Sequence, residues 1–167
     1  MQTLSLEEAV NEFLELKYLA VAGVSRHGDV AANSIYKKLR KHGYTVYPIN
    51  PNADEVEGDP CYADVNATPE RVEGVVIATH PQVSKQVIRD CAEAGIRHVW
   101  LHRSIGQGSL DEDAVNYGRE HNITVIPGGC PMMFLEPDFG HKCMKWWFSR
   151  TGTIPKYVTR SSTQQAV

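Results

Sequence analysis

The sequence has no long apolar run and no excess of positive charge, and these two absences exclude whole classes of protein. Because a membrane-spanning helix needs about 20 apolar residues, none is expected here. The N-terminal stretch MQTLSLEEAV also lacks the basic and apolar regions of a secretory signal peptide. The net charge of −3 argues against nucleic acid as a partner, since binding phosphates needs a basic surface. We therefore expect a cytoplasmic protein that binds neither a membrane nor a nucleic acid.

Closely spaced pairs of cysteine or histidine are absent too. The four cysteines are Cys61, Cys91, Cys130 and Cys143, and no two of them form a C-x-x-C pair. None of the seven histidines belongs to an H-x-x-x-H or H-E-x-x-H pattern. Scattered cysteines in a cytosolic chain are typical of free thiols, and a structural zinc site normally contains a close pair of ligands. We therefore predict no disulfide and no metal site.

The composition is that of one globular domain. The chain has 167 residues, of which 42% are apolar and 22% charged, and both shares are ordinary for a soluble protein. No repeat, linker or change in composition divides the chain. We expect a single domain over residues 1–150, followed by a polar tail over residues 151–167 that frays.

Signals for strands and helices alternate along that domain. Capping boxes that begin at Ser5 and Ser109 predict the starts of two helices, and residues 52–73 are expected to be irregular. Strands are expected at residues 18–24, 45–49, 74–78, 97–101 and 123–126. Helices are expected after the first, third and fourth of these strands, and a last helix over residues 140–150. Such alternation predicts βαβ units. The expected fold class is therefore α/β, with a Rossmann-like, doubly wound parallel five-stranded sheet and helices on both faces.

The most informative segment is GVSRHGDVAANSI, residues 23–35, between the first of these strands and a helix. Gly23, Ser25 and Gly28 give the spacing G-x-S-x-x-G, which resembles the dinucleotide fingerprint with serine in place of the middle glycine. A strand that turns into a helix presents backbone N–H groups and a positive helix end, and both favour a phosphate. On this interpretation, Gly23→Val abolishes binding and leaves the fold intact. The alternative is a tight connection in which glycine only permits the bend.

In such a fold, ligands bind beyond the carboxyl ends of the strands, where the strand order reverses. NAD-binding domains have Asp or Glu after the second strand, to accept hydrogen bonds from the ribose. This chain has Asn50 followed by Pro51, which carry no negative charge and tolerate a phosphorylated ribose. The alternative is that Asn-Pro only starts a turn.

The order of the motifs GVSRHGDVAANSI, GYTVYPINP, VEGDPCY, VVIATHP and AGIRHVWLH resembles the stand-alone CoA-binding domain family. That family shares its Rossmann-like fold with the nucleotide-binding domain of the succinyl-CoA synthetase α subunit, and the resemblance covers about residues 10–135. It implies that the chain binds the small molecule coenzyme A or an acyl-CoA. It also implies that the pyrophosphate is held by Gly23, Val24, Ser25 and Arg26, with Asn33 and Ser34 nearby. The adenosine would be flanked by Asn50 and Pro51. The pantetheine side would be lined by Ala78, Thr79, His80, Pro81 and Val83.

The sequence departs from the family pattern at three places. Members often carry a lysine or arginine soon after the Asn-Pro pair, suited to the 3′-phosphate, where this chain has Asn52, Ala53 and Asp54. Arg26 is the remaining candidate for that role, so the position of the 3′-phosphate stays open. The stretch LHRSIGQGS has histidine and arginine where glutamine is common, and GGCPMMFLEPDFGHK looks like a subgroup variant of a terminal segment.

The resemblance brings no reaction with it, so we expect a non-catalytic binding module and assign no catalytic residue. The alternative is an enzyme, either an NAD(P)-linked oxidoreductase or a CoA-dependent transferase. His80, His102 or His141 would then act as a general base, because histidine titrates near neutrality. We favour His80 and His102 as polar lining that hydrogen-bonds ligand or backbone. The neutral Asn50 argues against NAD, and a chain this short argues against both enzymes.

Two further features lie near the predicted binding edge. Cys130 follows the fifth strand and is either a partly exposed thiol that forms a mixed disulfide with CoA or, as we favour, a buried cysteine. Core and helix packing is the expected role of Trp100, Trp146, Trp147 and Phe148. The apolar run over residues 132–134 either covers the sheet edge or joins a subunit contact, and in the second case the protein would form a homodimer.

Overall fold

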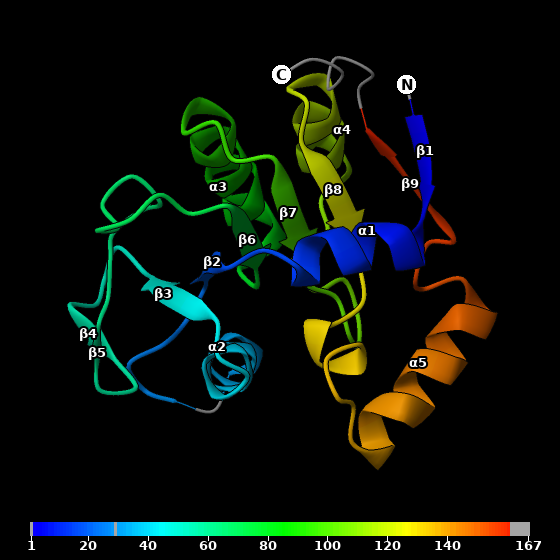
Figure 1. The fold of residues 1–167 in the computed structure, drawn as a ribbon, viewed down its shortest axis with the longest axis horizontal. Helices are drawn as coiled ribbons and strands as arrows, with labels where there is room; N and C mark the ends of the chain where they lie inside the picture. The colour runs from blue at the N-terminus through cyan, green and yellow to red at the C-terminus, as the bar shows by residue number, and fades with distance from the viewer. Residues whose placement is uncertain (1, 29, 161–167) are drawn as a thin grey trace.

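The computed structural model describes residues 2–28 and 30–160 and contains a parallel five-stranded sheet (Figure 1). In space its strands follow the order β3-β2-β6-β7-β8, so the order reverses between β2 and β6. This arrangement confirms the predicted Rossmann-like, doubly wound α/β fold. The strands are β2 (Tyr18–Ala22), β3 (Thr45–Ile49), β6 (Gly74–Ile77), β7 (His98–Leu101) and β8 (Thr124–Pro127).

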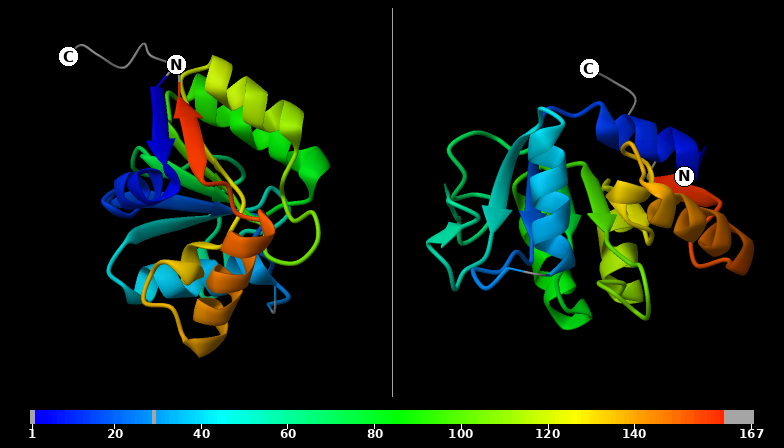
Figure 2. Two further views of the ribbon diagram at one scale, coloured as in Figure 1. Left: turned by 90° about the vertical axis from the view of Figure 1, so that its right-hand side faces the viewer. Right: turned by 90° about the horizontal axis from the view of Figure 1, so that it is seen from below.

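Helices cover both faces of this sheet, as the left view of Figure 2 shows. On one face lie α1 (Leu6–Leu14) and α2 (Ala31–Lys41), and on the other lie α3 (Pro81–Glu93) and α4 (Glu112–Glu120). Val21 and Ala22 in β2 point to opposite sides and join different hydrophobic clusters. Because every residue of β6 is buried, the sheet is covered on both sides, as its continuous apolar runs indicate.

Trp100 anchors the core on the α1 side. Its ring meets that of Phe13 edge to face at a centroid distance of 5.5 Å, and its indole N–H donates to the carbonyl of Gly128 at 2.9 Å. The other two tryptophans do not follow the prediction. Trp146 and Trp147 lie on α5 (Phe139–Thr151), a helix without buried residues, and are 57% and 59% exposed.

Local signals predicted one helix start correctly and another wrongly. The capping box at Ser5 is present, with the Glu8 N–H donating to Ser5 Oγ at 3.2 Å. The one predicted at Ser109 is wrong, because Asp111 is the N-cap of α4 and accepts from the Ala114 N–H at 2.8 Å. Ser109 is buried instead, and its Oγ donates to the Thr79 carbonyl at 2.7 Å.

The two ends of the described chain form a small antiparallel sheet of their own. In it, β1 (Gln2–Ser5) pairs with β9 (Tyr157–Arg160), and Figure 2 shows the two strands side by side. The expectation of a frayed tail is therefore wrong for residues 157–160, while residues 161–167 lie outside the described part. None of the described helices has the length and apolarity to cross a membrane.

Residues 52–73 also contain structure that the sequence does not predict. A short hairpin of β4 (Glu55–Val56) and β5 (Asp59–Pro60) lies beside α2. Further along the chain, the short 3₁₀ helix η1 (Pro131–Met133) buries Met133 in the core. Met133 is thus covered by this chain itself, and the homodimer stays a prediction.

Candidate functional site

A cavity of about 540 Å³ lies at the carboxyl edge of the sheet, where the strand order reverses. Ligands of doubly wound sheets bind at this position. Its wall is built by the loops after β2, β3 and β6, by residues 63–65 and by one side of α3. We call it the switch-point cavity.

A larger cavity of about 860 Å³ lies between residues 103–106 and α5. Its walls are mostly exposed apolar side chains such as Ile105, Trp146 and Trp147. It lies beyond β7 and away from the strand-order reversal, and none of the predicted site residues lines it. The switch-point cavity is therefore the better candidate, although it is the smaller one.

Gly23 lies where the first glycine turn touches the end of β6. It has a φ of +99°, and a Cβ placed on it would lie 2.4 Å from the carbonyl oxygen of Ala78. The chain itself therefore requires glycine here, whatever the ligand. The expectation that Gly23→Val spares the fold is wrong, because the added side chain would overlap the backbone of Ala78.

Several backbone groups of the glycine loop are already bonded within the chain. The Ser25 N–H donates to Asn33 Oδ1 at 2.7 Å, and the N–H groups of His27 and Gly28 donate to Ser25 Oγ and to the Ser25 carbonyl. Among the described residues, none accepts from the N–H of Val24 or Arg26. Both donors are therefore available to an anion, together with the first N–H groups of α2.

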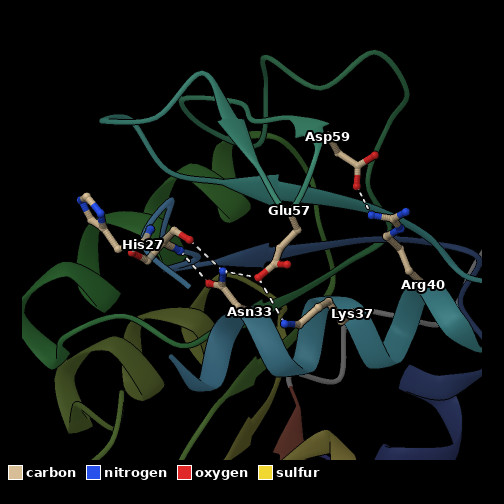
Figure 3. Close-up of polar contacts among 7 residues, drawn as sticks. His27, Asn33, Lys37, Arg40, Glu57 and Asp59 are labelled. Carbon is tan, nitrogen blue, oxygen red and sulfur yellow. Dashed lines mark hydrogen bonds and ion pairs between the residues drawn. The ribbon is translucent and has the colours of Figure 1, made fainter. Parts of the chain in front are cut away.

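Asn33 braces this loop from α2, as Figure 3 shows. It is 1% exposed, and its Nδ2 donates to the Ser25 carbonyl at 2.7 Å and to Glu57 Oε1 at 2.8 Å. The hydrogen bond from Asn33 is the main cause that lowers the pKa of Glu57, and Lys37, at 3.3 Å, adds to it. Asn33 thus connects the glycine loop to the β4–β5 hairpin by hydrogen bonds.

A second polar contact fixes the same hairpin to α2. Asp59 Oδ2 accepts from the hydroxyl of Tyr36 at 2.5 Å and pairs with Arg40 (Figure 3). Desolvation and the nearby carboxylate together raise the pKa of Tyr36. The hairpin is therefore held to α2 at two points.

Asn50 joins the ends of β2 and β3. Its Nδ2 donates to the Val24 carbonyl at 2.7 Å, and its Oδ1 accepts from the Asn52 N–H at 2.8 Å. Its backbone N–H donates to the Tyr62 carbonyl at 2.9 Å, which brings residues 63–65 alongside. The turn interpretation of Asn-Pro thus holds, and both residues also line the cavity.

The loop after β6 is held by a chain of hydroxyl groups. Ser109 Oγ donates to the Thr79 carbonyl, and Ser84 Oγ donates to the Ser109 carbonyl at 2.9 Å. His80 is exposed and is the N-cap residue of α3, whose first residue is Pro81. These contacts give the cavity a fixed wall opposite Asn50.

Comparison with known proteins agrees with this geometry. A family model described as a CoA binding domain matches residues 17–136. The chain belongs to the CoA-binding domain family. Among solved structures, a hypothetical protein from Pyrococcus horikoshii OT3 shares 27% identity at a TM-score of 0.71, covering 80% of this chain and 93% of that one. This CoA-binding domain is also 25% identical to the uncharacterized protein YneT of Bacillus subtilis, over 78% of this chain and 93% of YneT.

Longer relatives contain the domain as one part. The acetate–CoA ligase [ADP-forming] II subunit alpha of Pyrococcus furiosus is 30% identical over 71% of this chain, which covers 27% of that subunit. A ligase of this kind from Archaeoglobus fulgidus is matched over only 18% of its length. The dinucleotide forming acetyl-coenzyme A synthetase 1 of Ca. Korarchaeum cryptofilum, solved with phosphate and ADP, has a TM-score of 0.62 and 28% identity, with 71% of this chain and 27% of that one covered.

Nine of the residues assigned from the sequence line the switch-point cavity of this CoA-binding domain: Gly23, Val24, Ser25, Asn50, Pro51, Ala78, Thr79, His80 and Val83. Six others do not: Arg26, Asn33, Ser34, Pro81, His102 and Cys130. Sequence reasoning missed further lining residues, including Asp64, Gln86, Val87 and Asp90. Three of these follow Val83 at helical spacing, so they could have been predicted as the same face of α3.

His102 and Cys130 are buried away from the cavity. His102 is 7% exposed, and its desolvation lowers its pKa to about 4. Cys130 is 3% exposed, and desolvation raises the pKa of its thiol to about 11. The partly exposed, acidified thiol considered for Cys130 is therefore wrong, and the buried alternative holds. All four cysteines are free thiols, as predicted.

The electrostatics of the cavity are unusual for an anion site. Among the described residues of its wall, the charged side chains are the carboxylates of Asp64 and Asp90, and none is a lysine or arginine. Within residues 2–28 and 30–160, no group of three or more histidine, cysteine or acidic residues is placed to hold a metal ion.

Proposed function

We propose that this CoA-binding domain binds coenzyme A or an acyl-CoA in the switch-point cavity and carries no reaction of its own. The observation that carries the proposal is the cavity at the reversal of strand order, next to the glycine loop. A volume of about 540 Å³ lies in the usual range of small-molecule sites. CoA is also the ligand for which the family is named.

The pyrophosphate would accept from the free N–H groups of Val24 and Arg26 and from the Ser25 hydroxyl. Both N–H groups belong to the loop that precedes α2, where backbone donors favour an anion. The adenosine would lie between Pro51 and residues 63–65. The pantetheine would follow the loop after β6 toward Val83, which is 48% exposed and gives an apolar wall.

The curated relatives whose names state an activity are ligases, and this chain matches only a minor part of their length. We infer that it provides the CoA-binding part alone, in the cytoplasm, as a carrier or a sensor. The cavity wall has one histidine, His80, and neither of the other candidate bases lines it. A dehydrogenase or transferase on this chain therefore lacks an assembled group of catalytic side chains.

Ligand-dependent thermal unfolding tests the proposal. A ligand at a hundredfold excess over its dissociation constant stabilises the folded protein by about 2.7 kcal/mol. CoA should therefore raise the melting temperature, whereas NADH at the same concentration should not. Equal stabilisation by NADH, or stabilisation by NADH alone, would favour the oxidoreductase.

A matched pair of variants locates the site. Val83→Asp puts a carboxylate into the cavity wall and should weaken CoA binding about tenfold or more, as measured by calorimetry. Gln82→Asp makes a similar change on the exposed neighbouring residue, which does not line the cavity, and should leave the affinity unchanged. Equal effects of the two variants would contradict the assignment.

A further inference from the structure

The end of the cavity assigned to the adenosine carries negative charge and no cation. Asn50 and Pro51 form one side of this end, and residues 63–65 form the other, because the Asn50 N–H donates to the Tyr62 carbonyl. This pairing brings the carboxylate of Asp64 next to the Asn-Pro turn. In the wall formed by α3, Asp90 adds a second carboxylate.

Internal hydrogen bonds hold both carboxylates in place. Asp64 Oδ1 accepts from the N–H groups of Asn66 and Ala67 at 2.8 and 3.1 Å. Asp90 Oδ1 accepts from Gln86 Nε2 at 2.8 Å. Neither carboxylate has a positively charged partner in these contacts.

Three cations on the neighbouring helices are paired with carboxylates, and Arg89 of α3 lies over the ring of Tyr117. On α2, Lys37 pairs with Glu57 and Arg40 pairs with Asp59. On α3, Lys85 Nζ lies 2.5 Å from a carboxylate oxygen of Asp113 in α4. These cations face away from the adenosine end, since none of them lines the cavity.

Arg26 is the one candidate cation of the glycine loop. It is exposed and lies outside the cavity wall, beside the N–H groups assigned to the pyrophosphate. Its guanidinium would therefore serve the pyrophosphate, and it does not line the end of the cavity where Asn50 and Asp64 would meet the ribose.

We propose that the site prefers an adenosine ligand with a free ribose 3′-hydroxyl, dephospho-CoA, over one with a 3′-phosphate, CoA itself. A carboxylate accepts a hydrogen bond from a ribose hydroxyl, whereas a phosphate monoester carries close to two negative charges at neutral pH and is repelled. CoA then binds with its 3′-phosphate turned toward solvent. This inference rests on the proposed function, because it assumes that the adenosine occupies this end of the cavity.

Calorimetric titration of the wild-type protein with CoA and with dephospho-CoA tests the preference. Repulsion between partly solvated charges predicts that dephospho-CoA binds about three- to tenfold tighter at low salt. The difference should shrink as salt is added, since mobile ions screen the carboxylates. Asp64→Asn should also reduce the difference in affinity between the two ligands. The variant removes the charge, while its amide oxygen can still accept from the N–H groups of Asn66 and Ala67.

Two further variants sharpen the test. Asn52→Lys places a cation after the Asn-Pro turn, in the wall of the cavity, and should strengthen CoA binding more than dephospho-CoA binding. Asp54→Asn removes an exposed carboxylate of the same segment that does not line the cavity, and it should alter neither affinity.

Two results would overturn the inference. If CoA binds more tightly than dephospho-CoA, the preference is wrong while the proposed function stands, and loss of the CoA advantage in Arg26→Ala would assign the 3′-phosphate to Arg26. If neither ligand binds, the proposed function fails and this inference fails with it.

Discussion

Gly23 and Gly28 allow a quantitative test of how tightly the glycine loop packs. A Cβ on Gly23 would lie 2.4 Å from the Ala78 oxygen at a φ of +99°, whereas a Cβ on Gly28, at φ +70°, meets nothing within 4 Å. A left-handed backbone costs a residue other than glycine about 1–2 kcal/mol, and an overpacked contact adds about 1–3 kcal/mol. Gly28→Ala should therefore cost about 1–2 kcal/mol, and Gly23→Ala about 2–5 kcal/mol.

Urea unfolding followed by tryptophan fluorescence measures both costs. Trp100 is fully buried and reports loss of the core, while Trp146 and Trp147 are exposed in the folded state already. Equal slopes against urea for wild type and variants would show that only stability changed. If the two alanine variants lose the same free energy, or if Gly23→Ala loses less than Gly28→Ala, the close approach of Gly23 to Ala78 is refuted.

Three further predictions concern buried groups. Because the pKa of His102 is lowered to about 4 in the folded state, the unfolded chain binds more protons between about pH 6.5 and pH 4. Stability should fall by about 3 kcal/mol as pH decreases through that window. His98 acts in the same direction through its own lowered pKa, and His102→Gln should flatten the curve. CoA disulfide should modify the exposed Cys143 and not the buried Cys130, and intact mass of Cys143→Ser checks this. Asn33→Ala leaves the Ser25 N–H without its partner and removes one of the two donors to the Ser25 carbonyl, so it should cost about 1–3 kcal/mol in urea unfolding. No measurable loss of stability would contradict its bracing role.

The five strands of the main sheet could be predicted from local sequence, because each is a short apolar run between turn residues. Residues 45–49 were predicted with both ends correct, and residues 74–78 extend one residue beyond β6. The pairing of β1 with β9 could not be predicted, because it joins residues about 150 positions apart and no local pattern records such a partner. The helix start at Ser109 was predicted wrongly for a different reason. Ser109 and Asp111 can both act as N-caps, and because Ser109 is buried and bonded to Thr79, Asp111 is the N-cap of α4.

The candidate site was predicted as far as the loops after β2, β3 and β6, and wrongly extended to the loops after β7 and β8. The sequence identifies residues that follow strands, but it does not tell which strands flank the reversal of order. The spatial order β3-β2-β6-β7-β8 puts that reversal between β2 and β6, and His102 and Cys130 follow strands beyond it. Residues 63–65 were missed because backbone bonds of Tyr62 with Pro48 and Asn50, which no local pattern records, bring them to the cavity.

The β4–β5 hairpin shows why the glycine loop holds its shape. Its turn places Glu57 at φ +54°, a left-handed conformation that favours glycine or asparagine. A strained backbone conformation of this kind persists where surrounding contacts hold it in place. Here the Glu57 carboxylate accepts a hydrogen bond from Asn33 and pairs with Lys37. Asn33 in turn fixes both backbone groups of Ser25. These contacts fix the backbone at Ser25, so a phosphate bound as we propose would meet preorganised N–H groups at Val24 and Arg26.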